Sequence, residues 1–299
     1  MTRRLQPVPW LLLAPFLLAL AAFWVMPLAQ GFWLSLHSDA LFDEPVWVGW
    51  SHYRTLLDDA RFWHALRNTA YYAACSIPLV ILFSLAVALL LRKAPRRFQG
   101  PLLLTLMLPG LTPPAVLAML YVLVFNGPHG LLNALFVTPF GFSPIDWLRD
   151  PAFIKPALVL QTLWRWCGFV TLILYSGLAG IPREYQYLAK TEGAGGWHIL
   201  LRITLPLLKH QLWFIAAFLL LDAFVLFEGS YVLLGGSGGT LDAGLLVIAY
   251  TYYTAFTLGH FGTAAAMGFA LVPPLLSAVF LFTFPQWKRR QRRKMPAQA

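Results

Sequence analysis

The chain has 299 residues, of which 59% are hydrophobic and only 11% are charged, and its formal net charge is +10. Soluble globular domains carry about 25% charged residues, so this composition excludes an ordinary soluble protein and indicates an integral membrane protein. The two cysteines, Cys75 and Cys167, lie within apolar runs, which is typical of small buried side chains and argues against a disulfide-based fold.

Six apolar runs are long enough to cross a bilayer as helices, which need about 17–25 residues each. They predict an all-α fold: a polytopic membrane protein with six transmembrane helices in a single domain, residues 1–299. Some runs contain prolines such as Pro78, which membrane helices tolerate where neighbouring helices satisfy the freed backbone groups. We therefore expect a packed bundle. The predicted spans cover residues 9–36, 69–92, 101–126, 155–180, 208–234 and 260–285.

The basic residues are unequally distributed between the two sides that these spans define. Cytoplasmic loops of membrane proteins carry an excess of lysine and arginine, so the side that holds 16 of the 22 basic residues is predicted to be cytoplasmic. Both termini lie on that side of a multi-pass protein of the inner (cytoplasmic) membrane. Its basic residues are Arg3, Arg4, Arg92, Lys93, Arg96, Arg97, Arg183, Lys190, Arg202, Lys209, Lys288, Arg289, Arg290, Arg292, Arg293 and Lys294.

The first apolar run, residues 9–36, admits two interpretations. A cleavable signal peptide has an apolar region of about 7–15 residues, whereas this run is longer and contains tryptophan, phenylalanine and proline. We therefore expect an uncleaved first span.

The segment after the first span, residues 37–68, is predicted to lie outside, with an amphipathic helix at the membrane surface. His37, His52 and His64 in this segment raise the possibility of a metal site. Their spacing fits no common ligand pattern, so we expect no metal site here.

Charged and polar residues interrupt the fourth and fifth spans. Arg165 in the fourth span is costly in a membrane and is by default a functional hypothesis. The alternative is that it reaches outward or pairs structurally with an acid on another helix. Asp222 and Glu228, six residues apart in the fifth predicted span, need the bundle interior or water around them. No set of histidine, serine or metal ligands accompanies them, so we expect no catalytic residue. The predicted translocation path comprises Asn126, Gln161, Trp164, Arg165, Asp222 and Glu228.

Residues 181–208 form the most polar interior segment with a helical pattern. Pro182 is typical of a helix start, and Glu184 places a carboxylate in the first turn, where the helix dipole favours it. Three glycines within residues 193–196 then permit a sharp turn, and a second helical pattern follows over residues 199–207. The segment predicts a short helix, a glycine turn and another short helix. Such a unit could dock into a partner, or it could rest as an amphipathic loop on lipid headgroups.

This segment resembles the EAA loop of ABC importer permeases. Ala189 fits the second alanine of that motif, Gly193-Ala194 its Gly-Ala pair, and residues 203–206 its closing Ile-x-Leu-Pro. Tyr187 replaces the usual glutamate, and Leu188 replaces the first alanine. In the family this loop is a coupling helix that docks into a cleft on a cytoplasmic ATPase. The resemblance implies the ATPase-coupling residues Glu184, Tyr187, Ala189, Glu192, Gly193, Ala194, Trp197, Ile203, Leu205 and Pro206.

Further stretches resemble the sugar-type branch of these permeases, which includes the maltose and glycerol-phosphate systems. They are residues 48–69, residues 106–126 with the Gly-Leu-Leu-Asn of 130–133, and the glycine-rich run 227–240. The resemblance implies a permease subunit of an ATP-driven, binding-protein-dependent importer for a sugar, oligosaccharide or glycerol-phosphate-type solute. The implied partners are a second permease subunit, a cytoplasmic ATPase dimer, an extracytoplasmic solute-binding protein and membrane lipid. The basic tail is interpreted as a topology anchor, not as a nucleic-acid site.

The chain contains no G-x-x-x-x-G-K-[ST] loop, so we expect it to hold no ATP. It is predicted to be no enzyme and to carry no cofactor, with ATP and magnesium bound in the separate ATPase. The alternative is an ion-coupled secondary transporter that uses Asp222, Glu228 and Arg165. Such folds usually show internal inverted repeats, and the loops after the second and fourth spans differ in length and composition. A nonconducting scaffold would leave the intramembrane charges unexplained, so the importer is favoured.

Overall fold

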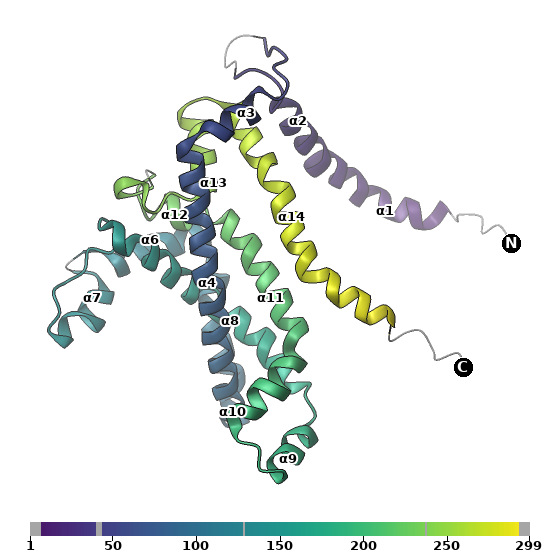
Figure 1. Ribbon diagram of the computed structural model, residues 1–299, viewed down its shortest axis with the longest axis vertical. Helices are drawn as coiled ribbons and strands as arrows, with labels where there is room; N and C mark the ends of the chain where they lie inside the picture. The colour runs from purple at the N-terminus through teal and green to yellow at the C-terminus, as the bar shows by residue number, and fades with distance from the viewer. Residues whose placement is uncertain (1–6, 40–43, 128, 237, 293–299) are drawn as a thin grey trace. The chain divides into compact units, whose positions relative to one another are not determined.

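A computed structural model describes residues 7–39, 44–127, 129–236 and 238–292 (Figure 1). The described residues form helices joined by turns and loops, which confirms the predicted all-α fold. An isolated antiparallel bridge joins His37 to Trp47. The basic residues Arg3, Arg4, Arg293 and Lys294 lie outside the described residues.

The chain falls into two compact units, and the first comprises residues 1–60 and 251–273. Asp39 fixes the start of the last helix within this unit. Its carboxylate accepts hydrogen bonds from the backbone N–H groups of Gly262 and Thr263, at 2.6 and 3.0 Å, and from the Thr263 hydroxyl. These contacts satisfy N–H groups that a helix start leaves free. The helices are α1 (Pro7–Leu20), η1 (Ala21–Val25), α2 (Met26–Leu34), α3 (Ser51–Asp58), η5 (Tyr253–Thr257) and the first part of α14 (Phe261–Arg292).

The second unit comprises residues 61–250 and 274–299. Its core lies where α4, α8 and α11 pack together, with buried residues such as Val80, Leu174 and Ile215 from the three helices in one cluster. The helices of this unit are α4 (Ala60–Lys93), α5 (Arg96–Leu111), α6 (Pro114–Phe125), α7 (Leu131–Phe136), η2 (Thr138–Phe140), α8 (Pro151–Ala179), α9 (Arg183–Thr191), α10 (Gly196–Ile199), η3 (Leu200–Thr204), α11 (Leu205–Val225), α12 (Glu228–Tyr231), η4 (Thr240–Asp242), most of α13 (Val247–Tyr252) and the second part of α14.

The predicted spans correspond to apolar helices. Among the described residues, five helices are long and apolar enough to cross a membrane: Leu12–Leu34, Ala60–Lys93, Pro151–Ala179, Gly196–Val225 and Phe261–Phe280. A sixth span exists if the bent pair α5 and α6 is counted as one.

The third predicted span, residues 101–126, is not one kinked helix, because α5 and α6 meet at 97°. Thr112 and Pro113 have extended ψ angles of 136° and 133° between the two helices. A residue before proline is pushed out of the helical region, and the proline itself donates no hydrogen bond. Two consecutive prolines therefore break the helix, whereas Pro78 lies inside an unbroken α4.

The fifth predicted span, residues 208–234, was wrong at its end. The helix α11 stops at Val225, because Leu226 leaves the helical region with a ψ of 84°. Glu228 therefore begins the short helix α12 and does not share a helix with Asp222.

Candidate functional site

The helix α9 and the turn that follows it form the core of the predicted coupling loop, at the end of the second unit away from α13 (Figure 1). The turn is a Schellman motif: the Gly193 N–H donates to the Lys190 carbonyl at 3.0 Å, and the Ala194 N–H donates to the Ala189 carbonyl at 2.9 Å. Gly193 has a φ of 80°, a left-handed conformation that glycine adopts without steric cost. The predicted helix and glycine turn are therefore present.

The second short helix of the prediction is not a separate element. Residues Gly196–Val225 form one continuous 30-residue helix through α10, η3 and α11. A π-helical turn precedes Pro206, where the Leu205 N–H reaches back to the Leu200 carbonyl. Such a turn accommodates a residue that interrupts the regular ladder of hydrogen bonds. Pro206 thus lies within this helix instead of starting a new one.

The predicted coupling residues are mostly accessible. Tyr187 is 64% exposed and Trp197 is 71% exposed, while Ala189 is buried against the bundle. Large exposed apolar side chains mark surfaces that contact other proteins or membranes. The other predicted coupling residues form two groups. Glu184, Glu192, Gly193 and Pro206 are exposed, whereas Ala194, Ile203 and Leu205 are partly buried.

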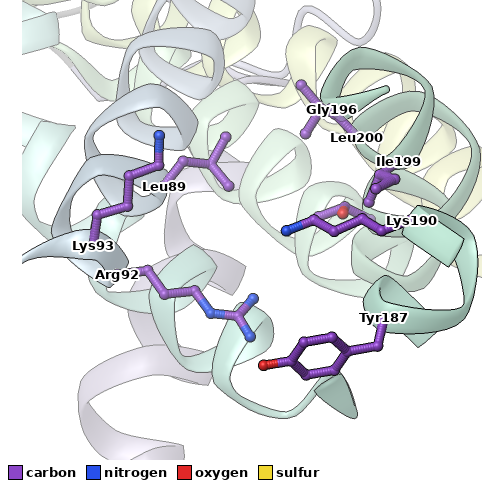
Figure 2. Close-up of a pocket in the computed structure, with 9 residues that line it drawn as sticks. Leu89, Arg92, Lys93, Tyr187, Lys190, Gly196, Ile199 and Leu200 are labelled. Carbon is purple, nitrogen blue, oxygen red and sulfur yellow. The ribbon is translucent and has the colours of Figure 1, made fainter. Parts of the chain in front are cut away.

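Two pockets lie on different sides of α9. The first, here called the basic pocket, has a volume of about 570 Å³, and in Figure 2 the ends of Arg92, Lys190 and Tyr187 converge on its open space. The second, the mixed pocket, has a volume of about 380 Å³ and carries one acid, Glu192, and one base, Arg202. The basic pocket is lined by Leu89, Arg92, Lys93, Tyr187, Lys190, Gly196, Ile199, Leu200 and Thr204.

A half-buried ion pair joins α8 to α11. The Arg165 guanidinium lies 3.9 Å from the Asp222 carboxylate, which also accepts a hydrogen bond from the Trp166 indole N–H at 2.7 Å. The guanidinium lies 4.8 Å from the centre of the Trp166 ring. The structure thus contains the ion pair that the sequence suggested for Arg165, and it is formed with Asp222. A role of the pair in a translocation path stays a prediction.

The remaining predicted path residues differ in their surroundings. Gln161 is 3% exposed, and its side-chain oxygen has no hydrogen-bond partner in the described part of the chain. Trp164 is partly exposed and packs edge-to-face on Tyr121, with ring centres 5.3 Å apart. Asn126 is exposed at the end of α6, and Glu228 is half-buried at the start of α12. The structure therefore brings only Arg165 and Asp222 of this set into an ion pair with each other.

Sequence reasoning did not assign the role of Asn133, which organises the loop between α6 and α8. This fully buried side chain donates to the carbonyls of Gly127 and Ile145, at 2.6 and 2.7 Å. Its oxygen accepts from the Ile145 N–H at 3.2 Å and from the Trp147 indole N–H at 3.0 Å. In the sequence, Asn133 was noted only as part of a family motif. The sole hint of its structural role was an amide side chain in a loop rich in glycine and proline.

A second group that the sequence left without a role anchors residues 240–247 to α4. The Asn68 amide donates to the carbonyls of Asp242 and Leu245, at 2.9 and 3.1 Å, and Thr69 accepts from the Val247 N–H. Arg61 adds a two-pronged ion pair with the Asp242 carboxylate, at 2.8 and 3.0 Å. These partners lie more than 170 residues apart in the sequence, so local patterns could not identify them.

The histidines considered as metal ligands make hydrogen bonds to backbone groups. His37 lies 2.6 Å from the Trp33 carbonyl, and His52 lies 2.7 Å from the His37 carbonyl. Within the described ranges, no group of three or more histidine, cysteine or acidic residues could hold a metal ion.

Comparison with known proteins places this architecture in a defined group. The family model described as "Binding-protein-dependent transport system inner membrane component" matches residues 80–288. The trehalose/maltose transport system permease protein MalF of Thermococcus litoralis is 31% identical over 276 residues, 91% of each chain. The arabinooligosaccharides transport system permease protein AraP of Bacillus subtilis is 30% identical over 272 residues, 91% of this chain and 86% of its own.

Solved structures share the fold. A bacterial ABC transporter involved in the import of the acidic polysaccharide alginate superposes with a TM-score of 0.77 at 19% identity, over 97% of this chain and 96% of its own. The same type of transporter in complex with a periplasmic protein bound to alginate pentasaccharide gives a TM-score of 0.75 at 18% identity, over 93% of each chain. At this level of identity the likeness establishes the fold.

Proposed function

The chain belongs to the family of binding-protein-dependent transport system inner membrane components, and we propose that it forms the membrane path of an importer for a sugar or an oligosaccharide. The observation that carries the proposal is the glycine-turned helix α9 at the position of the EAA loop, in a chain that aligns over nine-tenths of its length with sugar permeases. Relatives named for trehalose, maltose and arabinooligosaccharides support a carbohydrate as the solute.

The proposed energy source is a separate ATPase dimer that receives α9. The exposed side chains of Tyr187, Leu188 and Trp197 offer an apolar contact surface, and the chain itself lacks a phosphate-binding loop. Closure of the ATPase on ATP would move α9 and shift this permease and a second one between inward-open and outward-open states. The equilibrium is then biased by two ligands, ATP on one side and the loaded binding protein on the other.

The proposed solute path runs beside the Arg165–Asp222 pair and Gln161. Carbohydrate hydroxyl groups both donate and accept hydrogen bonds. The unpaired side-chain oxygen of Gln161 can accept such a bond, and the partly exposed Trp164 offers an aromatic face beside it. Asn126, at the end of α6, and Glu228, at the start of α12, complete the proposed path.

The proposed orientation places α9 and both termini in the cytoplasm. The positive-inside rule supports it, because basic residues gather at the last turn of α4 and in α5 and α9: Arg92, Lys93, Arg96, Arg97, Arg183 and Lys190. The solute-binding protein would then dock at the opposite face. None of the comparisons supports the alternative of an ion-coupled transporter.

The test begins with purification of the intact chain from its own membranes in mild detergent, with identification of the proteins that accompany it. We expect a second six-span permease and an ATPase. The assembly is then reconstituted into vesicles with its binding protein, and uptake of a labelled disaccharide should require ATP. Uptake by the chain alone, driven by a proton gradient, would contradict the proposal and favour the secondary transporter.

A further inference from the structure

The basic pocket gathers positive charge without an acid to balance it. Arg92 and Lys93 come from the last turn of α4, and Lys190 comes from the last turn of α9. Among the described residues, no carboxylate lines the pocket and none of these three cations forms a salt bridge. The mixed pocket, on another side of α9, pairs one acid with one base. Three unbalanced cations around a shared space constitute a site for an anion.

The rest of the lining is apolar or carries hydroxyl groups. Leu89, Ile199 and Leu200 supply hydrocarbon, while Tyr187 and Thr204 supply hydroxyls. Figure 2 shows the Arg92 guanidinium, the Lys190 ammonium and the Tyr187 hydroxyl directed into the same space. Arginine and lysine donate several hydrogen bonds each and are the usual ligands of phosphate oxygens. The volume of about 570 Å³ is that of a small-molecule site.

The position of the pocket at the ends of two apolar helices favours a lipid headgroup as the source of the anion. The apolar helix of Ala60–Lys93 ends at the pocket, and the apolar helix of Gly196–Val225 begins there. The pocket therefore lies where hydrocarbon gives way to headgroups, with leucine side chains beside the cations. Basic pockets between membrane helices on the cytoplasmic side are suited to lipid headgroups.

We propose that the basic pocket binds a phosphate group, and that the headgroup of an anionic phospholipid supplies it. The phosphodiester lies between Arg92 and Lys190 beside the Tyr187 hydroxyl, with Lys93 at the edge of the pocket, and the acyl chains leave along Leu89. A lipid held in this way contacts both the end of α4 and the coupling helix α9. The proposal concerns binding alone, so its outcome does not depend on whether the protein imports a sugar.

The experiment measures lipid binding to the full-length protein in nanodiscs of phosphatidylcholine with graded amounts of labelled phosphatidylglycerol. The pocket variant is the triple substitution Arg92→Gln, Lys93→Gln and Lys190→Gln. The matched control removes the same charge outside the pocket: Arg96→Gln, Arg97→Gln and Arg202→Gln. Because each hydrogen bond from a pocket cation to the phosphate contributes a factor of about five or more, the pocket variant should bind at least about 25-fold more weakly. The control should change binding less than about threefold.

Further arms separate the possible sources of the anion. Circular dichroism checks that both triple variants keep their helices, and the single variant Arg92→Gln, about fivefold weaker in binding, serves if the triple fails to fold. An equal loss in pocket and control variants would overturn the proposal, because the attraction would then be general. Pocket-dependent binding of inorganic phosphate in pure phosphatidylcholine, without preference for phosphatidylglycerol, would overturn the lipid source. Displacement of the lipid by the co-purified ATPase would assign the pocket to a protein partner instead.

Discussion

The second unit builds its two kinds of polar region in opposite ways. Residues 127–147 and 240–247 are held by buried side-chain amides, Asn133 and Asn68, that bond to distant backbone groups. The coupling loop at α9 is held by the backbone bonds of its own glycine turn, and its large side chains Tyr187 and Trp197 face outward. Buried side-chain hydrogen bonds thus fix residues 127–147 and 240–247, whereas the coupling loop keeps an exposed surface that a partner can contact.

The difference shows which interactions fix the conformation of each region. A buried amide with all its bonds made is costly to disturb, because the groups it leaves behind lose their partners away from water. Such a loop has one conformation before any partner arrives. The coupling loop keeps its local shape through Gly193, and its exposed apolar surface stays available for binding.

The largest effect is expected from Asn133→Ala. The substitution removes four hydrogen bonds and leaves three groups unpaired, the Trp147 indole N–H and the N–H and carbonyl of Ile145, while the Gly127 carbonyl keeps the Gly130 N–H at 3.4 Å. At about 1 kcal/mol or more for each, the free energy of unfolding should fall by about 3 kcal/mol or more. Tryptophan fluorescence during thermal unfolding in detergent measures the change. The control Asn126→Ala alters an exposed amide and should leave stability unchanged; equal effects would show that burial does not explain the result.

An intermediate effect is expected at the Arg165–Asp222 pair. Asp222→Leu leaves a half-buried guanidinium and the Trp166 indole without their acceptor, which should cost about 2 kcal/mol. Arg165→Met combined with Asp222→Leu should recover most of this loss, because no unpaired charge remains. We expect the double variant to fold normally and to lack solute uptake. Recovery of uptake together with stability would show that the pair is structural and does not contribute to the path.

The smallest effect on stability, with a large effect on assembly, is expected from Gly193→Val. A β-branched residue at a φ of 80° is strained by about 1–2 kcal/mol, so the turn should distort while the bundle still inserts. Co-purification with the ATPase should be lost. Gly195→Val is the matched control, because Gly195 has an ordinary φ of −68° and both sites have open space around them. Normal ATPase binding by the Gly193 variant would contradict the proposed role of the loop.

Hydrophobic runs predicted the helices, because every span in a membrane must satisfy its backbone hydrogen bonds internally, whatever its neighbours are. They did not predict which prolines break a helix: Pro78 is accommodated within α4, whereas Pro113 and Pro114 separate α5 from α6 at 97°. The single proline is accommodated and the two consecutive prolines interrupt the helix, a difference that hydrophobicity does not register. The end of α11 at Val225 was missed for the same reason, since residues 226–234 are as apolar as a span.

The candidate site was predictable in part. Charge complementarity suggested a partner for Arg165 among the acids of the fifth span, and the glycine turn was visible as three glycines in four positions. The sequence could not separate Asp222 from Glu228, because the break between them depends on the backbone of Leu226. The roles of Asn68 and Asn133 also stayed hidden, since an amide shows its importance only when the carbonyls that it meets are known. The basic pocket required α4 and α9 to be placed side by side.

The unbroken helix from Gly196 to Val225 has a mechanical consequence. Its 30 residues span about 45 Å, and the π-helical turn before Pro206 keeps it continuous. The helix therefore acts as a stiff lever with the coupling loop at one end and Asp222 near the other. If the proposed ATPase moves the loop, a continuous helix would carry that displacement toward the Arg165–Asp222 pair. The hydrogen-bonded glycine turn connects α9 to the start of this helix.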